Sequence, residues 1–383
     1  MDAKQLLKNK SFCPLPWTGF VVRQNGDIKN CILSKDVIGN IDEAPINEIL
    51  NGEKNKKIKQ QMLLDQKPSS CQGCYKLEHG KNNFDIISQR IYYLKELRQV
   101  DPSLYDQIGN FDLHTVDIRW TNQCNQACVY CGPHNSSLWE KEIGPRKMMS
   151  LAAKNDVRSY IYDNVHKLRN VYLAGGEPTL MNENLQFLGL LLEKNPQVHL
   201  RVNTNLNNID TKVSKLLMQF KNVHWLASVE SMDQHYNYIR HGGRWKQFRA
   251  NLIKIKQIES HKVSFNMLWC ILNHKELFRC VDHLQNMGFH NNSFVIGPLY
   301  DPDYLNILNL PEHKIDQLRN ILTEKIRQRP GFLLADSYNN LLRYLDTPFE
   351  KKLENSFKKL EELDTRRKLN SKLIFTELYD QNS

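Results

Sequence analysis

Three cysteines within eight residues constrain the fold of this chain more than any other feature of its sequence. They stand in the stretch Cys124-Asn-Gln-Ala-Cys128-Val-Tyr-Cys131-Gly132, directly after an apolar, β-like run at His114–Trp120. A spacing of three and then two residues lets all three sulfurs point into one loop, as iron–sulfur ligation requires. A structural zinc site is the alternative, and it needs a fourth ligand, for which His134 is the only close candidate. The sequence therefore predicts a metal centre at this loop.

A second motif lies farther along the chain, where a predicted strand runs into Gly-Gly-Glu-Pro in Val171-Tyr-Leu-Ala-Gly175-Gly176-Glu177-Pro178. Together with C-x3-C-x2-C, whose third cysteine follows the aromatic Tyr130, it resembles the two signatures of the radical S-adenosylmethionine (SAM) superfamily. In that family the three cysteines bind three irons of a [4Fe–4S] cluster, and the fourth iron is left open for SAM. The resemblance implies that SAM is cleaved reductively to a 5′-deoxyadenosyl radical, which abstracts a hydrogen atom from a substrate.

The resemblance also implies which residues hold the cofactor. The cluster ligands would be Cys124, Cys128 and Cys131. Tyr130 would sit beside the adenine. The segment Gly175-Gly176-Glu177-Pro178 would meet the amino group of SAM, since glycines let the backbone come close and a carboxylate suits an ammonium. No catalytic residue is assigned.

Four further contacts with SAM are implied at single residues. Asn203, Ser228 and Glu230 would hydrogen-bond the ribose or the methionine tail. Arg240 would pair with the carboxylate of SAM, because a guanidinium binds a carboxylate bidentately. Ordinary capping or packing is the alternative role for each of these four residues.

Between residues 106 and 300 predicted strands alternate with predicted helices, which indicates a parallel α/β sheet. The predicted strands are His114–Trp120, Asn170–Ala174, His199–Asn205, His224–Val229, Val263–Ile271 and Ser293–Pro298. The predicted helices include Leu185–Asn195, Lys212–Phe220 and Trp245–Ser260. Six strands with intervening helices resemble the partial (β/α)6 TIM barrel of the radical SAM family. In such barrels the chemistry gathers at the carboxyl ends of the strands, which is where both motifs fall.

Four more cysteines occur in the N-terminal part of the chain. Cys13 and Cys31 flank a predicted β-hairpin around Asn25-Gly26, and a hairpin brings its two ends together. Cys71 and Cys74 follow a helix predicted at about 45–64. Four thiolates suit either a [4Fe–4S] cluster or a structural zinc ion, and the residues alone do not separate these two sites.

The spacing C-x12-G-x4-C followed by C-x2-C resembles the auxiliary-cluster module called SPASM, or its shorter one-cluster form, twitch. The phrases Cys13-Pro-Leu-Pro-Trp17, Ile38-Gly-Asn-Ile41 and Cys74-Tyr75-Lys-Leu-Glu78 add to the resemblance. It implies a second, auxiliary [4Fe–4S] cluster on Cys13, Cys31, Cys71 and Cys74. In most family members this module follows the SAM domain, whereas here it precedes it. A cluster with four cysteine ligands lacks an open iron, which favours an electron-transfer role.

Three domains are predicted from these patterns. Residues 1–105 would form the SPASM/twitch-like domain, with a bridging helix at about Phe84–Val100, and residues 106–300 would form the radical SAM partial barrel. Residues 301–383 would form a helical extension, with helices near Glu312–Gln328 and Phe349–Arg367 and no ligand clusters. The extension is expected to cap the open edge of the barrel or to hold substrate.

Composition limits the function classes. The content of 40% hydrophobic and 25% charged residues suits a soluble globular protein, and no apolar run approaches the length that crosses a bilayer. The N-terminus lacks the apolar core of a secretory signal, so the predicted location is cytoplasmic. The net charge of +10, from 52 basic and 42 acidic residues, is spread along the chain without a compact basic stripe. A nucleic-acid partner is therefore an alternative that the charge pattern does not favour.

The sequence thus predicts a radical SAM oxidoreductase or modifying enzyme with an auxiliary cluster. It would oxidise, dehydrogenate or cross-link a peptide, a protein or a small molecule, and it would receive electrons from a donor such as flavodoxin or ferredoxin. Two alternatives stay open at this point. One is a zinc-stabilised nucleic-acid-binding protein, and the other is radical SAM modification of a nucleic acid or nucleotide.

Overall fold

The computed structural model describes residues 3–78, 88–95, 101–328 and 331–380, and these residues form two compact units. The first unit combines the chain up to Gln123 with Pro145–Val202 and Thr211–Val223. The second unit combines Cys124–Gly144, Asn203–Asp210 and His224–Ser383. The predicted domain boundaries near residues 105 and 300 stay a prediction.

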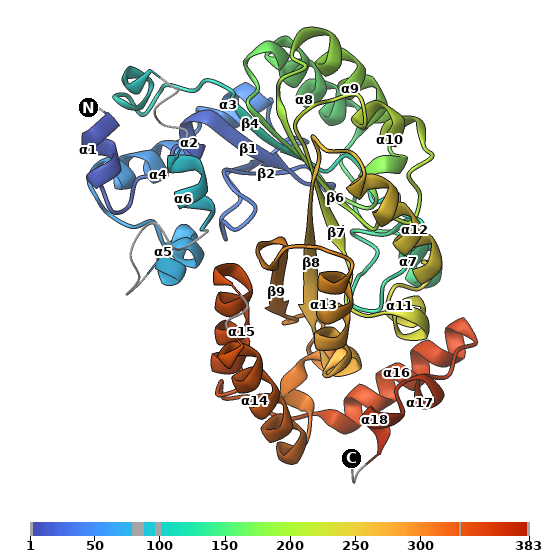
Figure 1. The fold of residues 1–383 in the computed structure, drawn as a ribbon. Helices are drawn as coiled ribbons and strands as arrows, with labels where there is room; N and C mark the ends of the chain where they lie inside the picture. The colour runs from blue at the N-terminus through green and yellow to red at the C-terminus, as the bar shows by residue number, and fades with distance from the viewer. Residues whose placement is uncertain (1–2, 79–87, 96–100, 329–330, 381–383) are drawn as a thin grey trace. The chain divides into compact units, whose positions relative to one another are not determined.

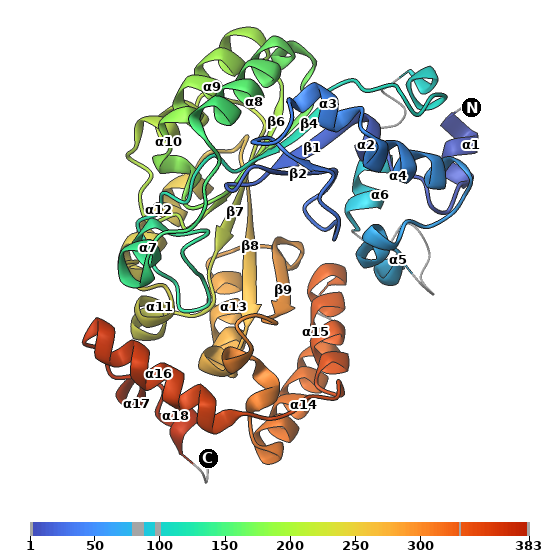
Figure 2. The same cartoon turned by 180° about the vertical axis from the view of Figure 1, so that it is seen from behind.

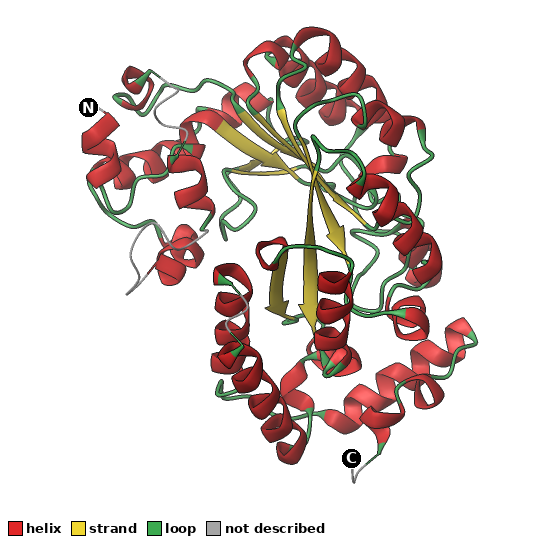
Figure 3. Cartoon of the chain, in the orientation of Figure 1, coloured by secondary structure: helices red, strands yellow, loops and turns green. Residues whose placement is uncertain are grey.

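The first unit is built on a mixed sheet (Figure 3). Strands β1 (Gly19–Val22), β2 (Asp27–Lys29) and β3 (Gly39–Asn40) run antiparallel, and β1 also pairs in parallel with β4 (Thr115–Ile118). The parallel order then continues through β5 (Asn170–Leu173) to β6 (His199–Thr204). The predicted hairpin is confirmed: Gly26 has a φ of +86°, the region that only glycine adopts freely, and its N–H donates to the carbonyl of Arg23 at 2.9 Å.

The second unit carries three parallel strands in the order β7 (Val223–Ser228), β8 (Lys262–Trp269) and β9 (Phe294–Pro298). All six strands predicted for the barrel are therefore present, and the α/β fold of a partial barrel is confirmed. Their burial explains why they could be predicted. Along β6, for example, Leu200, Val202 and Thr204 are buried while the intervening side chains are only partly buried, which is the period-two alternation of a strand.

Helices connect the strands. Those of the first unit are α1 (Ala3–Lys8), α2 (Leu15–Thr18), α3 (Ile46–Leu50), α4 (Glu53–Leu63), α5 (Gln72–Glu78), α6 (Gln89–Leu94), α8 (Leu151–Asp163), α9 (Asn182–Lys194) and α10 (Lys212–Leu217). Those of the second unit are α7 (Ser137–Ile143), α11 (Asp233–Ile239), α12 (Trp245–Lys256), α13 (Glu276–Asn286), α14 (Glu312–Arg327), α15 (Phe332–Tyr344), α16 (Leu353–Arg367), α17 (Ser371–Ile374) and α18 (Thr376–Tyr379). Figures 1 and 2 show α8, α9 and α10 on the same side of β4.

One helix prediction is wrong, and another can be compared with the structure only in part. The single helix predicted at about 45–64 is wrong, because α3 ends at Leu50 and α4 starts at Glu53. Gly52 between them is extended, with φ −73° and ψ 163°, and a glycine costs helical stability at that position. The bridging helix predicted at about Phe84–Val100 is described only as α6, and its remaining parts, 84–87 and 96–100, lie outside the described residues.

The C-terminal helices α14 and α16 confirm the two predicted for this region. Helix α15 was not predicted, and it packs against both α14 and β9. Within the described part of the chain, helices that combine the length and the apolarity needed to span a membrane are absent.

Candidate functional site

The loop that carries Cys124, Cys128 and Cys131 is held on two sides within the second unit. On one side its backbone pairs with the segment after α11, since Ala127 N–H donates to the carbonyl of His241 and Val129 N–H to that of Ile239, both at 2.8 Å. On the other side the indole N–H of Trp139, on α7, donates to the Cys128 carbonyl at 2.7 Å. These bonds fix the backbone that presents the three thiols.

Two glycines after Arg240 permit this close packing. Gly242 has a φ of +90°, and a Cβ there would come within 2.8 Å of the Asn125 carbonyl oxygen. A Cβ on Gly243 would lie 2.4 Å from the Gln126 side-chain nitrogen. The backbone therefore approaches the cysteine loop more closely than a side chain would allow. Neither glycine was assigned a role from the sequence, although the pair Gly242-Gly243, separated from Arg240 only by His241, was a signal for close packing.

Three predicted SAM contacts meet one another beside this loop. The guanidinium of Arg240 binds the carboxylate of Glu230 through Nε–Oε2 at 2.6 Å and Nη2–Oε1 at 2.8 Å, and Tyr130 donates its hydroxyl to Glu230 Oε1 at 3.0 Å. The Arg240 and Glu230 residues are only 4% and 1% exposed. Nη1 of Arg240 lies 3.8 Å from the sulfur of Cys128. A buried, carboxylate-anchored cation therefore faces one of the three thiols.

The electrostatics of this cluster follow from burial. Burial lowers the pKa of Arg240, but Glu230, Tyr130 and Cys128 together more than offset this effect, so the pKa lies well above its ordinary value and the guanidinium stays charged. Burial raises the pKa of the Cys128 thiol, and Arg240 opposes that rise. Burial also raises the pKa of Cys131 to about 12. The thiols therefore need further positive charge before they ionise, which bound iron supplies.

The asparagines and serine at the ends of β6 and β7 also lie in the second unit. The hydroxyl of Ser228 and the amide oxygen of Asn203 are 3.5 Å apart. Asn205 donates its side-chain N–H to Asn125 Oδ1 at 2.7 Å, and the same nitrogen is 4.0 Å from the sulfur of Cys124. Asn205 is a contact that the sequence analysis did not assign, although it belongs to the Asn203-Thr-Asn205 strand end.

The Gly-Gly-Glu-Pro segment lies in the first unit, against the residues that lead into Cys124. Gly175 has a φ of +120°, and a Cβ on Gly176 would come within 2.3 Å of the Gln123 carbonyl oxygen. Glu177 N–H donates to that carbonyl at 2.7 Å. The Glu177 carboxylate is 2% exposed, and its Oε1 accepts the N–H and hydroxyl of Thr179 at 3.2 and 2.8 Å as Pro178 begins a 3₁₀ turn. Both glycines are thus required by backbone geometry.

The four N-terminal cysteines line one pocket in the first unit. Besides Cys13, Cys31, Cys71 and Cys74, this pocket is lined by Leu15, Leu33, Ser34, Tyr75, Gln89 and Arg90. Burial raises the pKa of all four thiols, to about 12 for Cys31 and about 11 for Cys71. The neighbouring thiols raise the pKa values of Cys13, Cys31 and Cys71 further, because thiolates repel one another. Soft metal ions resolve that repulsion, so the donor set fits an iron–sulfur cluster.

A buried ion pair closes the four-cysteine pocket. Arg90, on α6, binds the Glu78 carboxylate through Nε–Oε2 at 2.9 Å and Nη2–Oε2 at 2.5 Å, and its Nη1 donates to the Phe12 carbonyl at 3.0 Å. The backbone N–H groups of Arg90 and Gln89 lower the pKa of the Cys74 thiol, which burial raises. The sequence analysis missed Gln89 and Arg90, because neither lies in the cysteine motifs and no local pattern marks them.

A third arginine, Arg367, contacts the tryptophan that binds the three-cysteine loop. The Arg367 guanidinium, on α16, has its Cζ 4.5 Å from the centroid of the Trp139 ring, and its Nε donates to Glu142 at 3.1 Å. Its two terminal nitrogens are buried and have no hydrogen-bond partner among the described residues. The C-terminal extension therefore contributes a buried cation next to the tryptophan that binds the Cys128 carbonyl.

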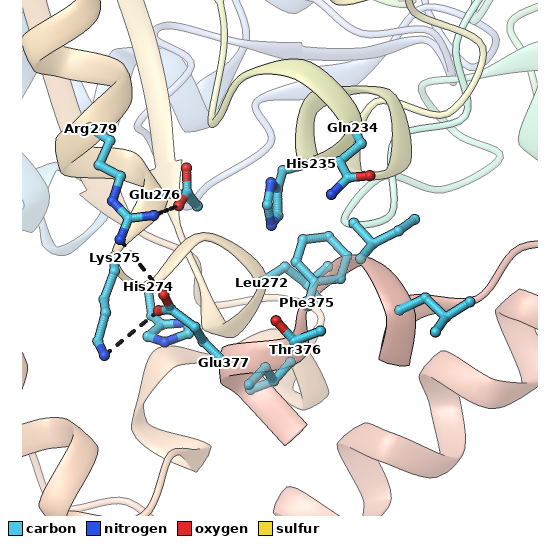
Figure 4. Close-up of a pocket in the computed structure, with 13 residues that line it drawn as sticks. Gln234, His235, Leu272, His274, Lys275, Glu276, Arg279, Phe375, Thr376 and Glu377 are labelled. Atoms are coloured by element: carbon cyan, nitrogen blue, oxygen red, sulfur yellow. Dashed lines mark hydrogen bonds and ion pairs between the residues drawn. The ribbon is translucent and has the colours of Figure 1, made fainter. Parts of the chain in front are cut away.

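A separate pocket of the second unit lies between α11, the start of α13 and the segment α17–α18 (Figure 4). Lys275 and Arg279 both face the carboxylate of Glu377, at 3.6 Å each, while His235 meets the ring of Phe375. The two cations are thus already compensated by a carboxylate of the C-terminal segment. We assign this pocket no ligand.

Comparisons with known proteins agree with this geometry. Residues 118–284 match the model of the radical SAM superfamily, and residues 13–75 match that of SPASM, an iron–sulfur cluster-binding domain. Among curated proteins, none matches this chain.

Several solved structures show a distant likeness. Native anSMEcpe with bound AdoMet is 20% identical, with a TM-score of 0.42, and the match covers 56% of this chain and 60% of that one. SuiB of Streptococcus suis bound to S-adenosylmethionine is 17% identical, with a TM-score of 0.42, over 74% of this chain and 60% of that one. SuiB has also been solved bound to the precursor peptide SuiA. This chain thus spans about three fifths of the first two structures.

Proposed function

The chain belongs to the radical SAM superfamily and carries a SPASM domain ahead of its SAM domain, and we propose that it cleaves SAM reductively to abstract a hydrogen atom from its substrate. The chain is thus an enzyme that uses a [4Fe–4S] cluster, SAM and an auxiliary iron–sulfur centre. The observation that carries the proposal is the tethered loop of three thiols with Arg240 and Glu230 beside it. When bound, the cluster and SAM supply the one-electron cleavage that yields the 5′-deoxyadenosyl radical.

We propose that Cys124, Cys128 and Cys131 ligate the cluster and leave one iron without a protein ligand. The loop backbone, fixed by α7 and the segment Ile239–Gly243, would keep the three sulfurs in place. Arg240 would hold positive charge next to Cys128, which favours the thiolate. Its pairing with Glu230 gives Arg240 an anchor within the protein, and the carboxylate of SAM would add to this contact.

The remaining SAM contacts are proposed from the motif positions. The Tyr130 ring would lie beside the adenine, with its hydroxyl oriented by Glu230. The carboxylate of Glu177, fixed by Thr179, would accept the amino group of SAM, and Gly175, Gly176 and Pro178 would set the path of that strand end. Asn203 and Ser228 would bind the ribose or the methionine tail.

We propose that Cys13, Cys31, Cys71 and Cys74 hold the auxiliary centre as a [4Fe–4S] cluster. Since all four ligands are cysteines, the role that fits is electron transfer rather than direct substrate binding. Overall the enzyme would oxidise, dehydrogenate or cross-link a peptide, a protein or a small molecule, with flavodoxin or ferredoxin as electron donor. The zinc-stabilised nucleic-acid-binding alternative loses its support, because both cysteine sets fall within iron–sulfur family matches.

The test is anaerobic purification and cluster reconstitution, followed by iron and sulfide analysis. The protein is then incubated with SAM and dithionite, and 5′-deoxyadenosine is measured. About eight irons per chain, for two [4Fe–4S] clusters, together with release of 5′-deoxyadenosine would support the proposal. A reconstituted protein that binds iron but does not cleave SAM would overturn it.

A further inference from the structure

Outside the cysteine sites, the first unit carries a row of charged and aromatic side chains across its parallel strands. Asp117 on β4 is in register with Tyr172 on β5, and Tyr172 is in register with Arg201 on β6. Side chains in register on neighbouring strands lie on the same face of a sheet. Along β6 the neighbours of Arg201 in sequence, Leu200 and Val202, are completely buried, so Arg201 belongs to the opposite, polar face of the strand.

Arg201 is held by aromatic rings alone. Its Cζ lies 5.4 Å from the centroid of the Tyr172 ring and 5.3 Å from that of Tyr92, so the guanidinium is oriented by two cation–π contacts. Hydrogen bonds and ion pairs from this guanidinium to other described residues are absent, and its Nε is buried without a partner. The tyrosines hold the planar group in place and leave its donors unused.

The carboxylate of Asp117, the acidic group of this row, already has an arginine partner. Both oxygens of Asp117 bind Arg119, with Nε–Oδ1 at 3.0 Å and Nη2–Oδ2 at 3.1 Å. Arg23, at the end of β1, and Arg201 also act on Asp117 through space. Asp117 therefore binds one guanidinium directly, and the charges of Arg201 and Arg23 also lower its pKa, so positive charge is in excess around this single carboxylate. A fixed, partly buried arginine that lacks an acidic partner is suited to an anion from outside the chain.

We propose that Arg201, oriented by Tyr92 and Tyr172 and supported by the charges of Arg23 and Arg119, binds an anionic group of the substrate, a carboxylate or a phosphate. The inference rests on the proposed function, because it assigns the polar face of the parallel strands to substrate. It narrows the substrate to molecules that carry such a group, such as an acidic peptide, an organic acid or a phosphorylated compound.

The experiment uses the reconstituted enzyme with two probes, inorganic phosphate and glutarate. Each is titrated by calorimetry at constant ionic strength, with chloride as the replaced ion, against wild type, Arg201→Gln, Arg201→Lys and the control Arg249→Gln. Arg249 is exposed on α12. We expect wild type and R249Q to bind at least one probe alike and R201Q to bind it about tenfold more weakly, since a charge-assisted bidentate contact is lost. R201K keeps the charge but not the fork and should fall between them.

The probe that binds identifies the source of the anion: phosphate alone indicates a phosphorylated substrate, and glutarate alone indicates a carboxylate. Failure of wild type to bind either probe would overturn the inference, and so would equal binding by a folded R201Q or R201K. SAM cleavage is measured in the same wild-type preparation. Cleavage without anion binding would remove this inference alone, whereas absence of cleavage would remove the proposed function itself.

Discussion

The two cysteine sites of this chain resemble each other in electrostatics and differ in how they are assembled. At each, a buried arginine–glutamate pair stands beside the thiols: Arg240–Glu230 in the second unit and Arg90–Glu78 in the first. The second-unit thiols come from one short loop. The first-unit thiols come from the two ends of a hairpin and from a distant helical turn.

The two cysteine sites require different support from the rest of the fold. Buried ion pairs of this kind contribute little net stability, because desolvation offsets their attraction. We infer that their value here is to fix a cation near thiolates, whatever the origin of the cysteines. The loop site needs close backbone packing to hold its shape, whereas the four-cysteine site needs α6 to close the pocket. Substitutions at the two sites can distinguish these requirements.

Removal of the cysteines should give the largest effect. A Cys124/Cys128/Cys131→Ala protein should lose about half of roughly eight irons and all 5′-deoxyadenosine formation, because the loop holds the cluster that binds SAM. A Cys13/Cys31/Cys71/Cys74→Ala protein should lose the other half. The control Cys280→Ala, a buried cysteine outside both sets, should keep its iron. Zinc in place of iron at either set, measured by elemental analysis, would contradict the account.

Loss of the buried carboxylates should come next. Glu230→Gln and Glu78→Gln each leave a buried guanidinium without its counter-charge, so the free energy of unfolding in urea should fall by about 3 kcal/mol. Electron paramagnetic resonance should distinguish the two variants. E230Q should alter the signal of the SAM-binding cluster, and E78Q should alter that of the auxiliary cluster.

The matched control for this pair is Glu312→Gln, whose partner Arg319 lies at the surface, where the glutamate side chain is 63% exposed. The free energy of unfolding should then change little, because a solvent-exposed ion pair contributes little stability. An equal loss of stability in E312Q would show that burial is not the cause.

Substitution of two glycines by alanine should have opposite effects on stability, because Gly176 is tightly packed and Gly73 has open space around it. Gly176→Ala forces a Cβ against the Gln123 carbonyl and should destabilise the protein by about 2 to 3 kcal/mol while lowering SAM cleavage. Gly73, which lies on α5 between Cys71 and Cys74, has open space around its Cβ position. Gly73→Ala should therefore stabilise the helix by up to about 1 kcal/mol. Thermal unfolding of the two variants in parallel checks the opposite signs.

A smaller loss of stability than that of Gly176→Ala should come from the C-terminal extension. Arg367→Gln removes the guanidinium that stacks on Trp139 and should cost about 1 to 2 kcal/mol and change the electron paramagnetic resonance of the SAM-binding cluster. Arg366→Gln, the neighbour that faces the same Glu142 at 3.6 Å from an exposed position, should change neither. A cluster signal that is identical in both variants would exclude a role for α16 at this site.

The local features of both sites could be predicted from the sequence. The strands alternate in burial, the hairpin has its Asn25-Gly26 turn, and the C-x3-C-x2-C spacing places three cysteines in one loop. These signals lie within short windows, where periodicity and turn chemistry decide the structure.

The tertiary features could not be predicted, because nothing in a short window encodes them. Arg240 was assigned to a SAM carboxylate, and its bond to Glu230 depends on how α11 returns to the strand end. The ion pair between Arg90 and Glu78 is a tertiary contact, and no motif marks Arg90. The prediction of one helix at about 45–64 followed the hydrophobic periodicity and gave too little weight to Gly52, which lies between α3 and α4.

The most direct test of the account is electron paramagnetic resonance of the reduced clusters with and without SAM, recorded on the two multiple-cysteine variants. The account predicts that SAM shifts the signal left in the Cys13/Cys31/Cys71/Cys74→Ala protein, whose loop cluster keeps an open iron. The signal left in the Cys124/Cys128/Cys131→Ala protein should not respond to SAM, because all four of its irons are bound by cysteine. A SAM-dependent shift in the latter protein, or none in the former, would contradict the assignment of the two sites.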